Sequence, residues 1–209
     1  MKAGPTTRNY GGRPVVDRRS DRRQRFLAAG LTVFGETGYT SSTITALCQA
    51  AKLARAQFYE NFDNREDLLI AVYDLVQNDA RSAVKAATEQ IASTDPVTRA
   101  RVAVTAYAES VGADPRRARV SYVEVVGVSA RVEQHRVDDR RIWSAFMESE
   151  LRRAAGDTFI PPGGYPAATT GFIGALMALV HQWSVSDPHG DLTDVIEVLT
   201  RFLLSLLQH

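Results

Sequence analysis

Residues 43–62 decide the fold of this chain, and they read TITALCQAAKLARAQFYENF. The first part carries apolar residues at i, i+3 and i+7, the spacing of a helix with one buried face: Ile44, Leu47 and Ala51. In the second part, Phe58 and Phe62 lie four positions apart and give another short helix a buried edge. The stretch therefore predicts two short helices joined by a tight turn.

The outward positions of this helix pair are polar. Their side chains are hydrogen-bond donors and acceptors of the kind that contact base edges and phosphates: Thr43, Thr45, Lys52, Arg55, Gln57 and Asn61. Arg55 has the chemistry to read guanine and Gln57 to read adenine, while Tyr59 suits a phosphate contact. A helix pair with a buried inner side and such an outer side is how a helix-turn-helix enters a major groove.

The region around this stretch, from Arg22 to about Val76, resembles the DNA-binding domain of the tetracycline-repressor (TetR) family of bacterial transcriptional regulators. An arginine-rich start is followed by FLAAGL at 26–31, FGETGY at 34–39, TI at 43–44, FYENF at 58–62 and REDLL at 65–69. These motifs are specific in combination and cover roughly a quarter of the chain. The remainder is similar to the family in its layout only.

By position, the resemblance implies this set of DNA-contacting residues: Thr43, Lys52, Arg55, Gln57, Tyr59, Asn61 and Arg65. Lys52 stands where the family usually has glycine, so either the turn is altered or the lysine accepts a left-handed backbone at a cost of roughly 1 kcal/mol. Ala54 replaces the usual serine or threonine cap of the recognition helix, and Asn61 replaces a common histidine. These departures bear on the operator sequence and leave the DNA-binding motif in place.

The charge of the chain is distributed unevenly. Residues 1–65 carry 11 Lys/Arg and 5 Asp/Glu, a net +6, whereas residues 66–209 carry 14 and 19, a net −5. A basic first third attached to an acidic remainder indicates that one end faces phosphates, and the alternative is chance plus a basic disordered tail. The apolar content of 44% and charged content of 23% are ordinary for a soluble globular protein.

Composition also bears on location. No run of about 18 apolar residues is present, so no membrane span is expected, and the N-terminus has no apolar stretch typical of a secretory signal. The single cysteine, Cys48, rules out an internal disulfide and suits a reducing, cytoplasmic protein. Cys48 lies in the helix pair, where a small buried apolar role is favoured over a redox switch.

Breakers and helical periodicity predict an all-α chain of about nine helices. Residues 1–16 form a disordered basic tail, residues 17–65 a helix-turn-helix domain of three helices, and residues 66–209 a helical ligand-binding and dimerisation domain. The first helix runs from Asp17 or Ser20 to Glu36, and Gly38 ends it. The other helices span about 43–50, 54–60, 64–89, 96–112, 115–127, 130–155, 166–186 and 191–207. Residues 120–128 are β-branched and could alternatively form a strand.

The last two predicted helices have the character of a homodimer interface. The final helix carries a wide apolar stripe, and the helix before it sets small residues beside large ones, which allows close helix approach. Two such helices can pair with their copies in a four-helix bundle, as the resemblance also implies, or they can cap the core of their own chain. The residues expected at the interface are Gly171, Ala175, Ala178, Trp183, Val195, Leu199, Phe202 and Leu206.

The middle helices carry aromatic residues with a few polar groups. Such walls suit a small apolar or aromatic ligand, and they suit a filled core equally well. The candidate ligand-binding residues are Tyr107, Tyr122, Glu124, Trp143, Met147 and Phe172.

The leading interpretation is a homodimeric repressor that binds the inverted repeat of a palindromic operator in double-stranded DNA and is released by a small-molecule ligand. The alternative keeps the DNA-binding head and replaces the ligand with a protein partner or no effector. A helical-bundle enzyme is disfavoured because the sequence has no Glu-x-x-His pair, no His-Glu-x-x-His and no Cys-His metal spacing. We therefore expect no catalytic residues, no metal and no cofactor.

Overall fold

The computed structural model describes residues 15–93, 95–156 and 158–207 of the chain. Over these residues the chain folds into nine α-helices and one π-helical turn, without a strand. The N-terminal helices are α1 (Val15–Thr37), α2 (Ile44–Ala51), α3 (Arg55–Tyr59) and α4 (Arg65–Gln90). They are followed by α5 (Pro96–Gly112), α6 (Pro115–Arg119), the π turn η1 (Val120–Glu124), α7 (Ala130–Ala155), α8 (Gly164–Val185) and α9 (Leu192–Ser205). The predicted all-α class is confirmed.

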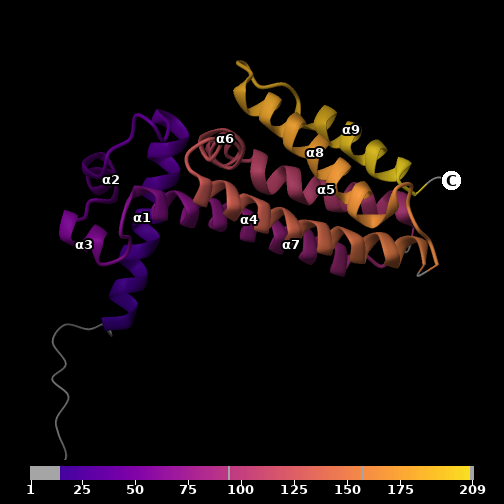
Figure 1. Ribbon diagram of the computed structural model, residues 1–209, viewed down its shortest axis with the longest axis horizontal. Coiled ribbons are helices and arrows are strands. Elements are labelled where there is room, and N and C mark those ends of the chain that lie inside the picture. Colours follow the sequence, from indigo (N-terminus) through magenta and orange to yellow (C-terminus); the bar gives the residue numbers. More distant parts are fainter. Residues whose placement is uncertain (1–14, 94, 157, 208–209) are drawn as a thin grey trace, which may run out of the picture.

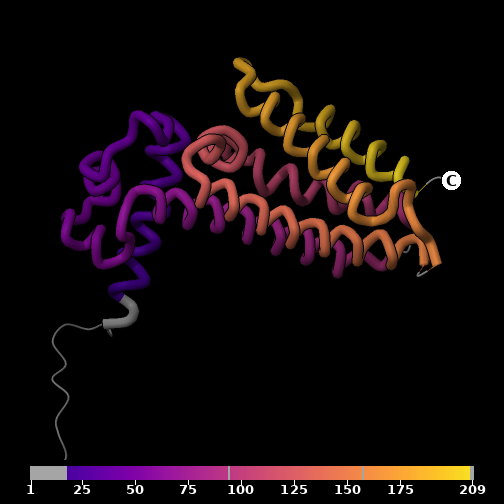
Figure 2. The backbone as a smooth tube through the Cα atoms, in the orientation of Figure 1, coloured from indigo at the N-terminus to yellow at the C-terminus, as the bar shows by residue number. Residues whose placement is uncertain are grey.

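The helices form a small head and a longer body (Figure 1). The head consists of α1, α2, α3 and the start of α4, and the body contains the rest of α4 with α5, α7, α8 and α9. Within the body, α5 packs against both α4 and α9, and α8 packs against α7 and α9. The short α6 and η1 lie where the body meets the head, and both contact α1 (Figure 2).

Polar side chains define where the helices of the head begin. Asn64 Oδ1 accepts a hydrogen bond from the Asp67 N–H at 2.9 Å and so caps the start of α4. Thr43 caps α2 in the same way by accepting from the Ala46 N–H at 3.1 Å. Both caps satisfy N–H groups that have no partner inside their helix, which fixes the boundaries around α2 and α3.

Some predicted boundaries differ from the structure. The helix α1 begins at Val15, before the expected Asp17 or Ser20, and the rest of the expected disordered tail lies outside the described residues. Residues 115–127 form neither one helix nor a strand, because the chain passes from α6 into the π turn η1. No helix of the described residues combines the length and apolar character that crossing a membrane requires.

The core of the head continues into the body. Its largest side chains are fully buried and come from α1, α2, α3 and α4: Phe26, Phe34, Leu47, Phe58 and Leu68. Val120 of η1 and Val132 of α7 belong to the same cluster. Since apolar burial contributes about 25 cal/mol per Å², this shared core seats the head firmly on the body.

Candidate DNA interface and ligand cavity

Three phenylalanines hold the short helix α3 against α1. Phe58 is fully buried, and its ring meets that of Phe26 edge-on at 5.4 Å between centroids. Phe62 lies 5.8 Å from Phe58 and 6.2 Å from Phe26. Aromatic pairs at these distances combine area burial with favourable ring electrostatics. With one side of α3 fixed inward, the opposite side must face solvent.

The turn between α2 and α3 keeps the left-handed geometry although Lys52 replaces glycine. Lys52 has φ of 53° and ψ of 45°, so of the two alternatives raised by the sequence, the lysine accepts the left-handed backbone. Arg25 of α1 donates from Nη2 to the carbonyls of Ala51 at 2.6 Å and Lys52 at 2.9 Å. These bonds satisfy the carbonyls at the end of α2, so Arg25 supports the turn from outside the motif.

The missing side-chain cap at Ala54 is partly replaced by Gln57. The N–H of Ala54 donates to Gln57 Oε1 at 2.9 Å, which supplies one half of a capping box. The Asn61 side chain turns back toward α3, because its Nδ2 donates to the Gln57 carbonyl at 2.8 Å. Two of the residues expected to contact DNA therefore bond the backbone of their own segment.

Arg55 and Tyr59 form the exposed edge of α3. Arg55 Nη2 donates to the Tyr59 hydroxyl at 3.2 Å, and its guanidinium lies 5.7 Å from the centre of the Tyr59 ring. Tyr59 is 47% exposed, so its ring and hydroxyl are accessible from solvent. Thr43 and Lys52 are also exposed, so four of the seven expected DNA-contacting side chains lie on the outer surface of the head.

Arg65 is directed inward. It donates from Nη1 to the Tyr39 carbonyl at 2.9 Å and to the Ser42 carbonyl, and its guanidinium lies 4.4 Å from the centre of the Tyr39 ring. It thereby fixes the loop before α2. The arginines of α1 have similar positioning contacts that periodicity could not reveal: Arg19 donates to the Glu60 carbonyl at 3.1 Å, and Arg22 pairs with the Glu60 carboxylate at 3.3 Å.

The thiol of Cys48 is buried inside the head, with 8% exposure. Burial raises the pKa of this thiol, and the nearby Arg55 offsets part of that rise. A protonated, covered thiol reacts slowly with oxidants, so its setting is that of a small apolar core residue.

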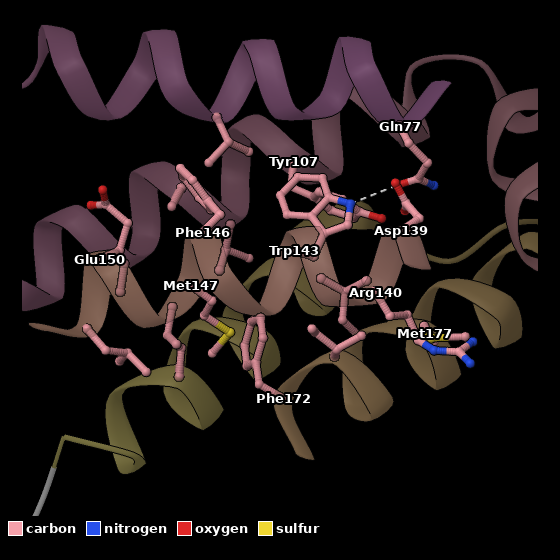
Figure 3. A pocket seen from close by; sticks show the side chains of 18 of the residues that line it. Gln77, Tyr107, Asp139, Arg140, Trp143, Phe146, Met147, Glu150, Phe172 and Met177 are labelled. Carbon is pink, nitrogen blue, oxygen red and sulfur yellow. Dashed lines mark hydrogen bonds between the residues drawn. The ribbon is translucent and has the colours of Figure 1, made fainter. Parts of the chain in front are cut away.

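A cavity of about 130 Å³ lies inside the body, between α4, α5, η1, α7, α8 and α9 (Figure 3). Five of the six candidate ligand-binding residues line it: Tyr107, Tyr122, Trp143, Met147 and Phe172. The prediction for Glu124 was wrong in placing it here. Glu124 instead accepts the Tyr39 N–H at 2.7 Å and pairs with Arg119 Nε at 2.9 Å, where the head meets the body.

One end of the cavity is polar and already hydrogen-bonded. Trp143 Nε1 donates to Gln77 Oε1 at 3.0 Å (Figure 3). The Tyr73 hydroxyl donates to Asp139 Oδ2 at 3.0 Å. Burial raises the pKa values of Tyr73 and Tyr122, so both phenols are neutral donors near pH 7. Tyr73 and Gln77 were not among the predicted ligand-binding residues, although they follow Leu69 on α4 at a helical spacing of four.

With this geometry in view, known proteins provide a comparison. Residues 26–72 match the family model for bacterial regulatory proteins of the tetR family. This chain carries a tetR-family domain. The head accordingly matches the helix-turn-helix domain of that family, and the resemblance recognised in the sequence is confirmed. No curated protein matches the chain.

Solved structures extend the comparison to the whole fold of this chain. The fatty acid degradation regulator FadR from Bacillus halodurans has a TM-score of 0.79 at 19% identity, covering 90% of this chain and 97% of its own. FadR from Bacillus subtilis, in complex with stearoyl-CoA, has a TM-score of 0.76 at 17% identity, covering 89% and 99%. AibR, in complex with isovaleryl coenzyme A and operator DNA, has a TM-score of 0.67 at 17% identity, covering 90% and 100%. At these identities the likeness shows a shared fold.

The expected interface residues divide between the surface and the core of the chain. On α8, Gly171 and Ala178 are exposed, Ala175 is half-buried, and a Cβ added at Gly171 would meet nothing within 4 Å. On α9, Phe202 is 41% exposed, whereas Leu199 is fully buried. The prediction for Leu199 needs correction, because this side chain packs in the core of its own chain and cannot reach a partner.

The remaining interface candidates, Trp183, Val195 and Leu206, are half-buried. Trp183 Nε1 donates to the Gly190 carbonyl at 2.8 Å, and the Trp183 ring stacks on His189 at 4.7 Å.

Among the described residues, no group of three or more His, Cys, Asp or Glu side chains is arranged to hold a metal ion.

Proposed function

We propose that this tetR-family protein is a homodimeric transcriptional repressor that leaves an inverted-repeat operator when a small apolar or aromatic ligand enters the cavity. The observation that carries the proposal is the exposed Arg55–Tyr59 edge of α3, which Phe58 seats rigidly on the head. An arginine that reaches a guanine edge and a tyrosine hydroxyl that reaches a phosphate would supply base and backbone contacts together.

The exposed faces of α8 and α9 support the homodimer. Gly171 and Ala178 leave α8 open to close helix approach, and Val198 and Phe202 expose apolar side chains one turn apart on α9. Two heads related by a twofold axis would read half-sites about 34 Å apart. A change of a few ångströms in head spacing would break that match and release the DNA.

The cavity in the body supports gating by a ligand. The FadR structure from Bacillus subtilis contains stearoyl-CoA and the AibR structure contains isovaleryl coenzyme A, each a molecule with an apolar acyl group. For this chain, the corresponding inference is a ligand whose apolar part lies among Trp143, Met147 and Phe172.

The test is binding of the purified full chain to the DNA that flanks its own gene, at several salt concentrations, with the mass measured by light scattering in the same buffer. We expect a dimer that binds this DNA more tightly than unrelated DNA and weakens as salt rises. Arg55→Ala should lower the affinity roughly 5- to 150-fold, the equivalent of one base contact.

Arg141→Ala is the matched control, because Arg141 is an exposed arginine on α7 whose side chain is 72% accessible. It should bind DNA like the wild type. A monomer with no preference for the flanking DNA, or an Arg55→Ala variant that binds as well as the control, would count against the proposal.

A further inference from the structure

Ser121 differs from the other hydroxyl-bearing side chains around the cavity. Among the described residues, four hydroxyl-bearing side chains line the cavity: Tyr73, Tyr107, Ser121 and Tyr122. The hydroxyls of Tyr107 and Tyr122 contact each other, and that of Tyr73 donates to Asp139. The Ser121 hydroxyl is buried, with 2% exposure of the residue, and has no hydrogen-bond partner among the described residues.

An unpartnered buried hydroxyl destabilises a protein unless something else uses it. Burying a hydroxyl without a partner forfeits its hydrogen bonds to water, so native proteins keep few such groups. Ser121 lies in η1, and π-helical turns occur frequently at functional sites. Its position on the cavity wall makes a bound molecule the natural partner.

The charged side chains that line the cavity restrict the charge that a bound molecule can carry. Each charged side chain of the described lining has an ion-pair partner: Arg99 pairs with Glu150, Asp139 with Arg81, and Arg136 and Arg140 with Glu133. A cationic group on the ligand would find no carboxylate of the lining without an arginine partner, and an anionic group would have to compete with the carboxylates that already hold the arginines, so a charge buried in the cavity is costly. The part of the ligand inside the cavity is therefore neutral.

The uncharged hydrogen-bonding groups of the lining indicate which polar group of the ligand fits. Gln77 Oε1 already accepts a hydrogen bond from Trp143, whereas the Ser121 hydroxyl has no partner among the described residues. A carbonyl oxygen needs only a donor, and Ser121 offers one. The ring of Trp143 and the side chains of Met147 and Phe172 then surround the body of the ligand (Figure 3).

We propose that Ser121 determines the ligand specificity of the cavity by donating a hydrogen bond to a carbonyl oxygen of a ligand whose buried part is uncharged, such as a ketone, an ester or a thioester. The inference rests on the proposed function, since it specifies the ligand of that same cavity. It also assigns the π turn a role in binding.

The probe is methyl nonyl ketone, compared with undecanoate, which has a similar chain and a negative charge. Binding is followed by the fluorescence of Trp143 in a Trp183→Phe background, which leaves Trp143 as the only tryptophan of the chain. The variant is Ser121→Ala. The matched control is Thr200→Val, because Thr200 Oγ1 is also buried and unpartnered in the described part of the chain but lies outside the cavity lining.

We expect the ketone to bind more tightly than undecanoate, and Ser121→Ala to weaken ketone binding roughly 2- to 13-fold, the equivalent of one neutral hydrogen bond. Thr200→Val should leave ketone binding unchanged. In the absence of any ligand, both substitutions should preserve or raise the Tm, because each removes an unpartnered buried hydroxyl. A loss of affinity without a loss of stability is a result that a merely structural serine would not give.

If the ketone binds the wild type and Ser121→Ala equally well, the proposed hydrogen bond from Ser121 to the ligand is wrong. If undecanoate binds as tightly as the ketone, the inference that the buried part of the ligand is uncharged is wrong. Failure of the ketone to alter Trp143 fluorescence would overturn both. Operator binding measured on the wild-type chain, which keeps Trp183, separates this inference from the proposed function. Intact DNA binding without ketone binding rejects only the inference, whereas absent DNA binding rejects the regulator.

Discussion

Replacing Glu124 with glutamine should loosen the junction between the head and the body. The Glu124 carboxylate accepts the Tyr39 N–H at 2.7 Å and pairs with Arg119 Nε at 2.9 Å, and its side chain is only 11% exposed. A hydrogen bond to a charged group contributes about 1.5–3 kcal/mol, against about 0.5–1.5 kcal/mol for a neutral one. Glutamine retains an acceptor for Tyr39, so the lost charge costs about 1–2 kcal/mol at that bond.

The second bond of Glu124 adds little to this figure. Arg119 is 40% exposed, so solvent screens its attraction to the carboxylate. The assay is urea unfolding followed by circular dichroism, in which the Glu124→Gln variant should lose about 1–2 kcal/mol of unfolding free energy with an unchanged m-value. For a chain of this length, the same loss lowers the Tm by about 2–8 °C.

Glu89→Gln provides the control, because Glu89 forms an exposed pair with Lys85 at 3.9 Å and should change stability by less than about 0.5 kcal/mol. Hydrogen exchange locates the effect: the Tyr39 amide should exchange faster in Glu124→Gln, and amides in the middle of α5 should not. The reasoning fails if Glu124→Gln is as stable as Glu89→Gln, or if exchange at Tyr39 is unaltered.

For two further substitutions, the structure predicts the direction of the change in stability. Lys52→Gly should raise the unfolding free energy by about 1 kcal/mol in urea, because it relieves a left-handed lysine, and it should lower the salt dependence of operator binding if the ammonium contacts a phosphate. Burial raises the folded-state pKa values of Tyr73 and Tyr122 above the ordinary value of about 10, so their contribution to stability is complete below that pH and is lost as pH rises above it. Tyr73→Phe should therefore flatten the decline of the urea midpoint above about pH 10, and an unchanged slope would contradict this assignment.

Local patterns in the sequence were sufficient to predict most of the fold. Apolar spacing and breakers placed the helices to within a few residues, because most of the helices have their own buried stripe and their own side-chain cap. The capping residue Asn64 and the buried edge made by Phe58 and Phe62 depend on residues close in the chain, and both are present.

Contacts between distant segments could not be predicted in this way. Arg65 and Gln57 have the side chains of DNA readers, yet Arg65 bonds the loop before α2 and Gln57 caps α3. Leu199 shares the apolar stripe of Phe202, but which of the two reaches the surface depends on how α9 packs against α5 and α8. Periodicity identifies a buried face and says nothing about which neighbour covers it.

The π turn shows what this limit means for function. Three of its five residues face different parts of the molecule: Ser121 and Tyr122 line the cavity, and Glu124 holds the Tyr39 N–H of the head. The Arg65 guanidinium lies over the Tyr39 ring and donates a hydrogen bond to the Tyr39 carbonyl, beside the loop that leads into α2. Because Ser121 and Tyr122 lie three and two positions from Glu124 on the same turn of backbone, we expect a molecule that displaces either of them to shift Glu124 as well. The loss of regular helix that made residues 115–127 hard to predict is therefore also what brings the cavity and the DNA-binding head onto one turn of chain.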